Sequence, residues 1–326
     1  MEVTHPVYDH LWKEVITELF EEFLLFFSPE LYEEIDFTSQ PEFLEQELHT
    51  IIPDSKSNHR YADKLVKLKL KNGQEQWVFI HIEVQGGYKK DFSKRMFQYF
   101  YRVMDLYDQQ IFALAIFTSN VSTNKMTSFH YDFFGTHLNY HYNTYRIASQ
   151  SEIELLQSNN PFALAVLAGL YLINSNKDID LKYKYKQKLM RLILQDKMNV
   201  RELNRKTVQQ LFIFIDHILR LPDNAEGKIY KELKPLIEKE DTHMGLSLED
   251  TAFAKFARKE AREEGLKEGL REGHKEGRKE GIEQGEKQKA IEIATRILKK
   301  GGSEEEVADI TGLPLVEVIR LKGSLD

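Results

Sequence analysis

The chain has 326 residues, of which 41% are hydrophobic and 30% charged, and its formal net charge is −7. This acidic balance argues against a protein that coats nucleic acid through bulk positive charge. Because the sequence contains no cysteine, disulfides, thiolate zinc sites and cysteine nucleophiles are excluded. No targeting segment is recognisable and no apolar run reaches the roughly 20 residues of a membrane span, so we expect a cytoplasmic protein without membrane contact.

The first half of the chain alternates helix and strand patterns. Apolar residues at three- and four-residue steps predict helices over 9–27 and 89–107. Short segments rich in Val, Ile, Leu and Phe and broken by Pro, Asn and Gly predict strands over 44–52, 61–70, 77–85, 111–118 and 138–147. We therefore expect an α/β fold over residues 1–149 and a helical region over 150–257.

The turn Asn72-Gly73 predicts a β-hairpin between the second and third of these strands. A two-residue loop would mix the aliphatic and polar faces of the strands. A three-residue loop, Asn72-Gly73-Gln74, pairs Val66 with Ile80 and keeps the aliphatic faces together. In that register Asp63 lies directly opposite Glu83, on the face away from the aliphatic side chains.

Two carboxylates that face each other across neighbouring strands repel unless a cation lies between them. Mg²⁺ binds carboxylate oxygens and water, so the pair Asp63 and Glu83 is a candidate metal site. The alternative stays open that Asp63 pairs with a neighbouring lysine, Lys64 or Lys67, and that Glu83 is simply solvated at the end of its strand.

The order of these residues resembles a known signature. Asp63 followed by Glu83-Val84-Gln85 on the next strand is similar to the D…(D/E)xK pattern of the PD-(D/E)XK nuclease superfamily. Five segments further resemble the recombination-promoting nuclease and transposase (Rpn-like) family: Tyr8-Asp-His-Leu-Trp-Lys-Glu, Arg60-Tyr-Ala-Asp-Lys-Leu-Val-Lys-Leu, Ile80-His-Ile-Glu-Val-Gln, Arg95-Met-Phe-Gln-Tyr-Phe-Tyr-Arg and Phe134-Gly-Thr. The resemblance implies an αβββαβ core.

It also implies roles for individual residues. Asp63 and Glu83 would bind Mg²⁺ or Mn²⁺, and Val84 could add its backbone carbonyl. Gln85 stands where the superfamily has lysine, so it could position a water molecule but not stabilise negative charge. A lysine from elsewhere, such as Lys64 or Lys89, is a substitute to consider.

Accessory residues follow from the two predicted helices. Glu14 or Glu18 on the first helix could reach the metal, and Arg95, Gln98 and Arg102 on the second could bind phosphate, because the arginine fork suits it. For each, a solvated helix surface is the alternative.

The carboxylate pair and the resemblance together imply a metal-dependent DNA endonuclease, whose metal would lower the pKa of a bound water. The resemblance also implies a connection with recombination or transposition. The alternative is a catalytically weak or inactive protein that binds DNA or self-assembles through its helical tail. A zinc site is not expected, since His137 and His141 fall on a strand, where residues four apart are about 13 Å apart.

The C-terminal tail has the strongest internal repeat, a glycine every four residues from Gly265 to Gly285. Ten basic and nine acidic residues between Arg258 and Lys289 nearly cancel, which argues against a basic DNA-binding arm. Residues 258–289 therefore form either a long exposed helix, which could make a homodimer, or a charged linker.

Residues 290–326 have the pattern of a small helix–turn–helix. Ser303 is the expected N-cap, with Glu306 as its capping-box partner. The expected core consists of Val307, Ile310, Leu313, Leu315 and Ile319. The second helix, 314–322, carries only two basic residues, Arg320 and Lys322. We therefore expect a packing module rather than a reader of DNA bases.

Overall fold

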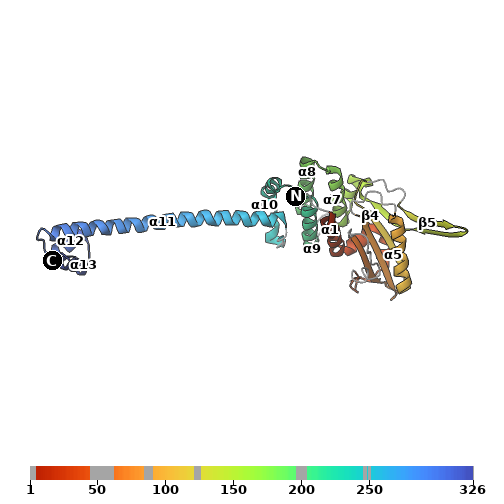
Figure 1. Cartoon of the computed structure of the whole chain (residues 1–326), viewed down its shortest axis with the longest axis horizontal. Helices are drawn as coiled ribbons and strands as arrows, with labels where there is room; N and C mark the ends of the chain where they lie inside the picture. Colours follow the sequence, from red (N-terminus) through yellow and green to blue (C-terminus); the bar gives the residue numbers. More distant parts are fainter. Residues whose placement is uncertain are drawn as a thin grey trace. The chain divides into compact units, whose positions relative to one another are not determined.

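A computed structural model describes residues 5–44, 62–83, 91–120, 126–195, 204–244, 248 and 251–325 (Figure 1). The chain folds as two compact units, Met1–Phe256 and Ala257–Asp326. The first is mixed α/β and the second is helical, so the predicted α/β class is confirmed. None of the described helices is both long and apolar enough to cross a bilayer.

A five-stranded sheet lies in the first unit, in the order β1-β2-β3-β4-β7. Its strands are β1 (Glu42–Phe43), β2 (Ala62–Lys69), β3 (Glu75–Glu83), β4 (Ile111–Phe117) and β7 (Asn143–Arg146). Strands β1, β2 and β3 are antiparallel neighbours, whereas β3, β4 and β7 run parallel. Parallel neighbours need a crossover, and α5 (Phe92–Tyr107) supplies it between β3 and β4.

Helices cover both faces of this sheet (Figure 1). On one face, strand residues pack against α1 (His5–Glu18), α2 (Phe20–Phe27) and α7 (Phe162–Ser175); they are Val66, Leu68, Leu114 and Ile116. On the other face, strand residues pack against α5; they are Leu65, Ala113, Ala115 and Phe117. The two sets alternate along β2 and β4, as a strand buried on both faces requires.

The helical region completes the first core. It contains α6 (Glu152–Gln157), α7, α8 (Ile179–Gln195), α9 (Arg205–Ile218) and α10 (Asp223–Met244); the short α3 (Pro29–Glu34) and η1 (Ile147–Ser149) connect other elements. Helix α7 is buried on all sides from Phe162 to Tyr171, which is typical of a helix inside a core. Trp12 of α1 packs edge-on against Phe214 of α9 at 5.1 Å. Residues 152–244 contain the expected helices, and they share one core with the α/β elements that precede them.

Three predicted elements have different bounds. The helix expected over 9–27 is broken at Leu19, whose φ of −116° and ψ of 41° are not helical, and it forms the two helices α1 and α2. The strand expected over 44–52 lies almost entirely outside the described residues, which exclude 45–61. The short strand β1 directly precedes it. The single strand expected over 138–147 is two strands, β6 (Thr136–His141) and β7.

The break between β6 and β7 has a structural reason. Strand β6 pairs with β5 (Ser128–Phe133) in a separate two-stranded sheet, whereas β7 pairs with β4. Between them the Tyr142 hydroxyl donates to the Met126 carbonyl at 2.6 Å, and Asn143 donates to the Ala113 carbonyl at 3.2 Å. Alternating apolar residues cannot distinguish one long strand from two that join different sheets.

The register of the β2–β3 hairpin corrects the predicted one. The loop has three residues as expected, but they are Lys71-Asn72-Gly73, since the Leu70 N–H donates to the Gln74 carbonyl at 2.7 Å. Gly73 has a φ of +85°, a left-handed conformation that glycine adopts readily at the end of such a loop. Val66 therefore pairs with Val78, and not with Ile80.

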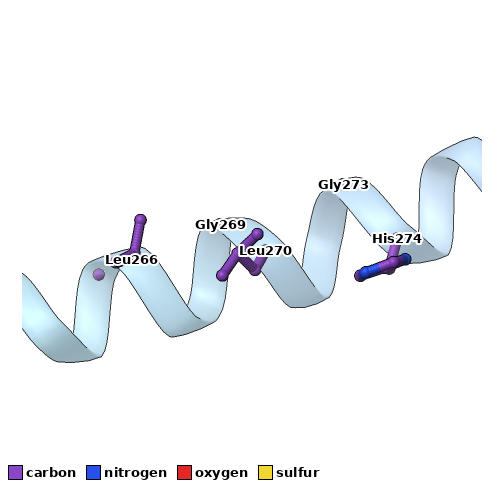
Figure 2. A pocket seen from close by; sticks show the side chains of 6 residues that line it. Leu266, Gly269, Leu270, Gly273 and His274 are labelled. Atoms are coloured by element: carbon purple, nitrogen blue, oxygen red, sulfur yellow. The ribbon is translucent and has the colours of Figure 1, made fainter.

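The second unit contains most of α11 (Ala252–Leu298), followed by α12 (Glu304–Thr311) and α13 (Leu315–Gly323). Since α11 is continuous through the glycine repeat, the helix alternative is confirmed over the linker. A methyl group added at any repeat glycine, from Gly265 to Gly285, would meet open space. Figure 2 shows Leu266, Leu270 and His274 along this helix, next to the glycines.

The end of the chain is the expected helix–turn–helix. Ser303 accepts a hydrogen bond from the Glu306 N–H at 3.4 Å, as predicted for the cap. The core consists of Ala294, Leu298, Val307, Leu313 and Val318. The predicted core positions Ile310, Leu315 and Ile319 are wrong, since these side chains are exposed. Helix α11 supplies two core residues, so α13 needs to bury only the side that carries Val318.

Candidate metal and nucleic-acid site

Asp63 and Glu83 lie on neighbouring strands of the central sheet. The register pairs Asp63 with His81, two residues before Glu83, so the two acids are diagonal neighbours rather than directly opposite. Every second residue of a strand belongs to the same face, so position 63 lies on the same face as Leu65, which is the face that α5 covers. Val84 and Gln85 lie outside the described residues, as do the side chains of Asp63 and Glu83.

The end of the sheet that carries Glu83 lies under the first turn of α5. Glu83 is in register with Phe117 of β4, and Phe117 with Arg146 of β7. Phe117 packs against Phe92 with 5.2 Å between ring centres, and the Arg95 guanidinium lies 5.9 Å from the Phe92 ring. The prediction of one strand over 138–147 did not place Arg146 beside Phe117 at this end of the sheet.

Helix α5 carries the predicted phosphate ligands. Arg95 and Arg102 are half-buried, and Gln98 is exposed. Spacings of three and four residues place them along one side of the helix, next to the buried stripe that includes Met96 and Val103. A planar guanidinium donates two parallel hydrogen bonds to phosphate, which is the chemistry that these positions offer.

Lys64 is not placed to replace the missing lysine. It alternates with Asp63 along β2, and its buried side chain belongs to the opposite face of the sheet, where Nζ lies 5.1 Å from the centre of the Phe43 ring. Lys89, the other substitute, lies outside the described residues.

The first helix also points its acids elsewhere. Glu14 pairs with His10 at 3.1 Å, and Glu18 pairs with Lys206 of α9 at 3.1 Å. Helix α1 packs on the face of the sheet opposite α5. The structure therefore does not bring Glu14 or Glu18 together with the positions of Asp63 and Glu83.

Two buried tyrosines, Tyr140 and Tyr142, lie beside α5. The Tyr142 hydroxyl lies 3.0 Å from the Ser93 hydroxyl and donates to the Met126 carbonyl. Burial raises the pKa of Tyr142 to about 12 and also raises that of Tyr140. Both therefore stay protonated at neutral pH, and Tyr142 acts as a structural hydrogen-bond donor.

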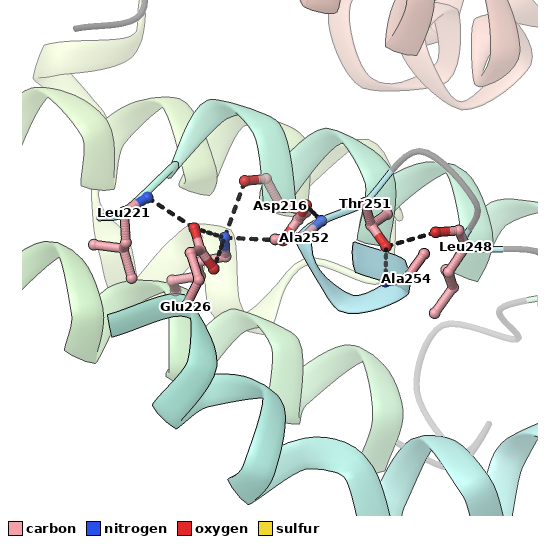
Figure 3. A network of polar contacts seen from close by, with 8 residues as sticks. Asp216, Leu221, Glu226, Leu248, Thr251, Ala252 and Ala254 are labelled. Atoms are coloured by element: carbon pink, nitrogen blue, oxygen red, sulfur yellow. Dashed lines mark hydrogen bonds and ion pairs between the residues drawn. The ribbon is translucent and has the colours of Figure 1, made fainter. Parts of the chain in front are cut away.

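A second cluster of charges lies inside the helical region (Figure 3). Lys186 of α8 is fully buried, and its Nζ lies 2.9 Å from Asp216 of α9 and 2.7 Å from Glu226 of α10. Glu226 also accepts a hydrogen bond from the Leu221 N–H at 2.8 Å, and Asp216 accepts one from the Ala252 N–H at 2.7 Å. Since Ala252 begins α11, this network fixes three helices and the start of a fourth.

Burial, opposed by the Lys186 charge, raises the pKa of Glu226. The network contains one ammonium and two carboxylates, each with hydrogen bonds to neighbouring groups. We interpret this network of paired, buried charges as a structural one.

Among the side chains that the structure describes, which exclude those of Asp63 and Glu83, no three His, Asp or Glu residues converge as a metal site would require. His137 and His141 lie on strand β6, as expected. Comparisons with protein-family models, curated proteins and solved structures found no match for this chain.

Proposed function

We propose that this protein is a metal-dependent endonuclease that hydrolyses phosphodiester bonds of DNA. One observation carries the proposal: Asp63 and Glu83 occupy same-face positions on adjacent strands, beneath a helix that carries two arginines. The succession of helix, antiparallel β1, β2 and β3, crossover helix α5 and parallel β4 supports a core of the PD-(D/E)XK type.

The residues fit a divalent metal ion. Diagonal neighbours on one face of an antiparallel pair are about 7–8 Å apart between Cα atoms, within reach of two carboxylates that share one ion. Mg²⁺ and Mn²⁺ accept carboxylate and carbonyl oxygens, which Asp63, Glu83 and the Val84 carbonyl would provide. When bound, such an ion polarises a phosphoryl oxygen and lowers the pKa of a water.

The other residues of the site would hold the substrate. Arg95 and Arg102 would bind the phosphates on either side of the cleaved bond and orient it. Gln85 would hold the attacking water through its amide without supplying positive charge. We therefore propose a slow enzyme, and we associate it with recombination or transposition only through the resemblance of its motifs.

Plasmid nicking with 5–10 mM Mn²⁺ or Mg²⁺, concentrations on the order of those that saturate a weak carboxylate site, tests the proposal. We expect Asp63→Asn and Glu83→Gln to lower the rate by about 100-fold or more, since even outer-shell changes at metal sites cost 10–100-fold. Glu75→Gln is the matched control, because Glu75 is an exposed acid at the other end of the same strand.

Two results would contradict the proposal. Equal nicking by all four proteins would mean that the activity is a contaminant or belongs to another site. The second is a wild type that nicks no plasmid and shows no Mn²⁺ binding in calorimetry beyond that of Asp63→Asn. That result would mean that the two acids hold no metal.

A second candidate function is self-association through α11. The observation that favours it is the stripe of glycines from Gly265 to Gly285, each without a neighbour, beside the exposed Leu266 and Leu270. Each glycine costs a helix about 0.5–1 kcal/mol relative to alanine, a cost that close packing of a second copy would offset. Light scattering after gel filtration, which measures the molar mass, tests this self-association. A molar mass of one chain at micromolar concentration would contradict it.

A further inference from the structure

The β5–β6 hairpin projects from the first unit beyond α5 (Figure 1). Its strands are joined by a two-residue turn, Phe134-Gly135, since Phe133 pairs with Thr136. Both turn residues have positive φ, 43° and 85°, which is the type I′ turn that matches the twist of a tight hairpin. Phe134 thus occupies a conformation that is disfavoured for a residue with a Cβ, at the outermost point of the hairpin.

The tip of the hairpin is aromatic and exposed. Phe134 is 94% exposed, Phe133 58% and Tyr131 47%. The Phe133 and Phe134 rings are 4.7 Å apart and perpendicular, and Phe134 is nonetheless almost fully exposed. An exposed aromatic ring on a tight turn is suited to stacking on a flat partner.

The two faces of the hairpin differ in chemistry. Residues that pair directly share a face, and three successive pairs on one face are polar: Ser128 with His141, His130 with Asn139, and Asp132 with His137. The other face carries the aromatic side chains of Phe129, Tyr131 and Phe133. The polar face offers imidazole, amide and hydroxyl groups, which both donate and accept hydrogen bonds, and the Asp132 carboxylate, which lies 2.9 Å from His137 and accepts hydrogen bonds only.

The base of the hairpin is fixed on the helix of the candidate site. Phe129 stacks on Phe97 of α5 with 5.2 Å between ring centres and 16° between planes. Tyr140 packs against Phe100 of α5 at 4.7 Å, and Phe97 in turn stacks on the exposed Tyr101. The hairpin is therefore continuous with the face of the sheet to which Asp63 and Glu83 belong.

Three kinds of partner can be compared. A stable protein interface buries about 800 Å² on each side, whereas three partly exposed rings at 150–250 Å² each fall well short of that. Membrane anchors combine apolar residues with Lys or Arg, and residues 128–141 contain no Lys and no Arg. Nucleic acid fits better, because a two-stranded β-ribbon enters the major groove and bases stack on aromatic rings.

We propose that the β5–β6 hairpin binds duplex DNA, with its polar face along the base edges and Phe134 stacked on a base that it unstacks. This inference rests on the proposed nuclease function and extends it, since the hairpin would hold the DNA across α5 and beside Asp63 and Glu83. Lys94, exposed on α5, and Arg102 would contact the adjacent phosphates.

The test uses the full chain with a fluorescein-labelled duplex and a second duplex that carries 2-aminopurine. Measurements in EDTA separate binding from cleavage. We expect the wild type to bind and to raise the 2-aminopurine emission, which reports unstacking. Phe134→Ala should weaken binding by about 5–150-fold, the equivalent of 1–3 kcal/mol for one stacked base, and abolish the emission change. Phe134→Trp should keep both.

Leu106→Ala is the matched control, because Leu106 is 60% exposed near the end of α5 and outside the hairpin. Both side chains are exposed, and circular dichroism should confirm that both variants fold. Equal DNA affinity of Phe134→Ala and Leu106→Ala would overturn the proposal. The proposal would also be overturned if the protein bound phosphatidylserine vesicles in a Phe134-dependent way and did not bind DNA.

The outcomes separate this inference from the proposed function. A wild type that unstacks 2-aminopurine but nicks no plasmid with metal would support the hairpin and contradict the nuclease. A wild type that nicks plasmid, with unchanged binding by Phe134→Ala, would support the nuclease and contradict the hairpin.

Discussion

Asp63 of β2 is paired directly with His81 of β3, and Glu83 stands two residues beyond that pair. Had the two acids been directly opposite, their repulsion would have been strongest across one pair of Cα atoms. The diagonal arrangement puts His81 at the position opposite Asp63. Under the proposed metal-dependent function, we therefore expect replacement of His81 to change the metal affinity.

The register can be tested by disulfide formation, since the chain contains no cysteine of its own. Lys69 pairs with Glu75 outside the hydrogen-bonded pair Leu70–Gln74, and both side chains are exposed. Cα atoms of such a pair are about 4.5 Å apart, within the range of a disulfide. We expect Lys69→Cys with Glu75→Cys to oxidise nearly completely in mass spectrometry.

Lys69→Cys with Trp77→Cys is the matched control, because the register predicted from the aliphatic pattern would pair those two residues. Preferential oxidation of this control would show that the pattern was right and that Asp63 does face Glu83.

The error in that prediction has a physical origin. A shift of two residues keeps every side chain on its face, so Val66 meets an aliphatic partner whether it pairs with Val78 or with Ile80. What decides is the loop, where Gly73 takes the left-handed position at its third residue. The preference of three-residue hairpin loops for glycine at the third position would have predicted this loop from the sequence. The two strands, and the side chains on each of their faces, were predicted.

Other features could not be found from local patterns. Ile310, Leu315 and Ile319 have the spacing of a core face, yet α11 supplies Ala294 and Leu298 from outside that segment and takes their place. In the same way, Glu14 and Glu18 have the spacing of site residues. Only the packing of α1 on the far face of the sheet separates them from Asp63 and Glu83.

Lys186→Met should strongly destabilise the first unit. It leaves Asp216 and Glu226 buried without their cation, and breaking a buried pair in this way costs about 3–5 kcal/mol. Lys188→Met, which removes an exposed lysine two residues away, should cost less than about 1 kcal/mol. Urea unfolding measured by circular dichroism compares the two.

The loss should also depend on pH. Because burial raises the pKa of Glu226, the native protein favours its neutral form, and the cost of its charge appears as the pH rises through that pKa. Without Lys186 that cost grows, so Lys186→Met should be more destabilised at pH 8 than at pH 5. The same loss at both values would contradict an ionised Glu226.

Glu152 should make an opposite contribution. Hydrogen bonds from Lys188 at 2.7 Å and from the Tyr171 hydroxyl at 2.6 Å lower its pKa below the usual 4.5. Its stabilising effect is therefore present above about pH 4.5 and lost as the pH falls through its lowered pKa.

Glu152→Gln should accordingly lower the melting temperature at pH 7 and cease to do so near pH 3. Glu154→Gln, an exposed change on the same helix, is the control. A melting-temperature difference that stays constant between the two pH values would show that the Glu152 carboxylate is not held by these donors.

Gly169→Ala should destabilise the core of the first unit. A methyl group at Gly169 in α7 would lie 2.9 Å from Cζ2 of Trp12 and 3.2 Å from Cδ1 of Ile147, and both neighbours are fully buried. Overpacking of this kind costs about 1–3 kcal/mol, more than the 0.5–1 kcal/mol that alanine returns in helix propensity. Tryptophan fluorescence during urea unfolding measures the balance, because both tryptophans of the chain, Trp12 and Trp77, belong to this unit.

Gly265→Ala is the control for this change, since its methyl group meets open space on α11. It should leave the tryptophan transition unchanged and raise the helical signal of the second unit. A Gly265→Ala protein that instead loses helicity together with a dimer would mean that a second copy packs against the glycine stripe. A Gly169→Ala protein as stable as the wild type would mean that α7 and Trp12 are less closely packed than the structure has them.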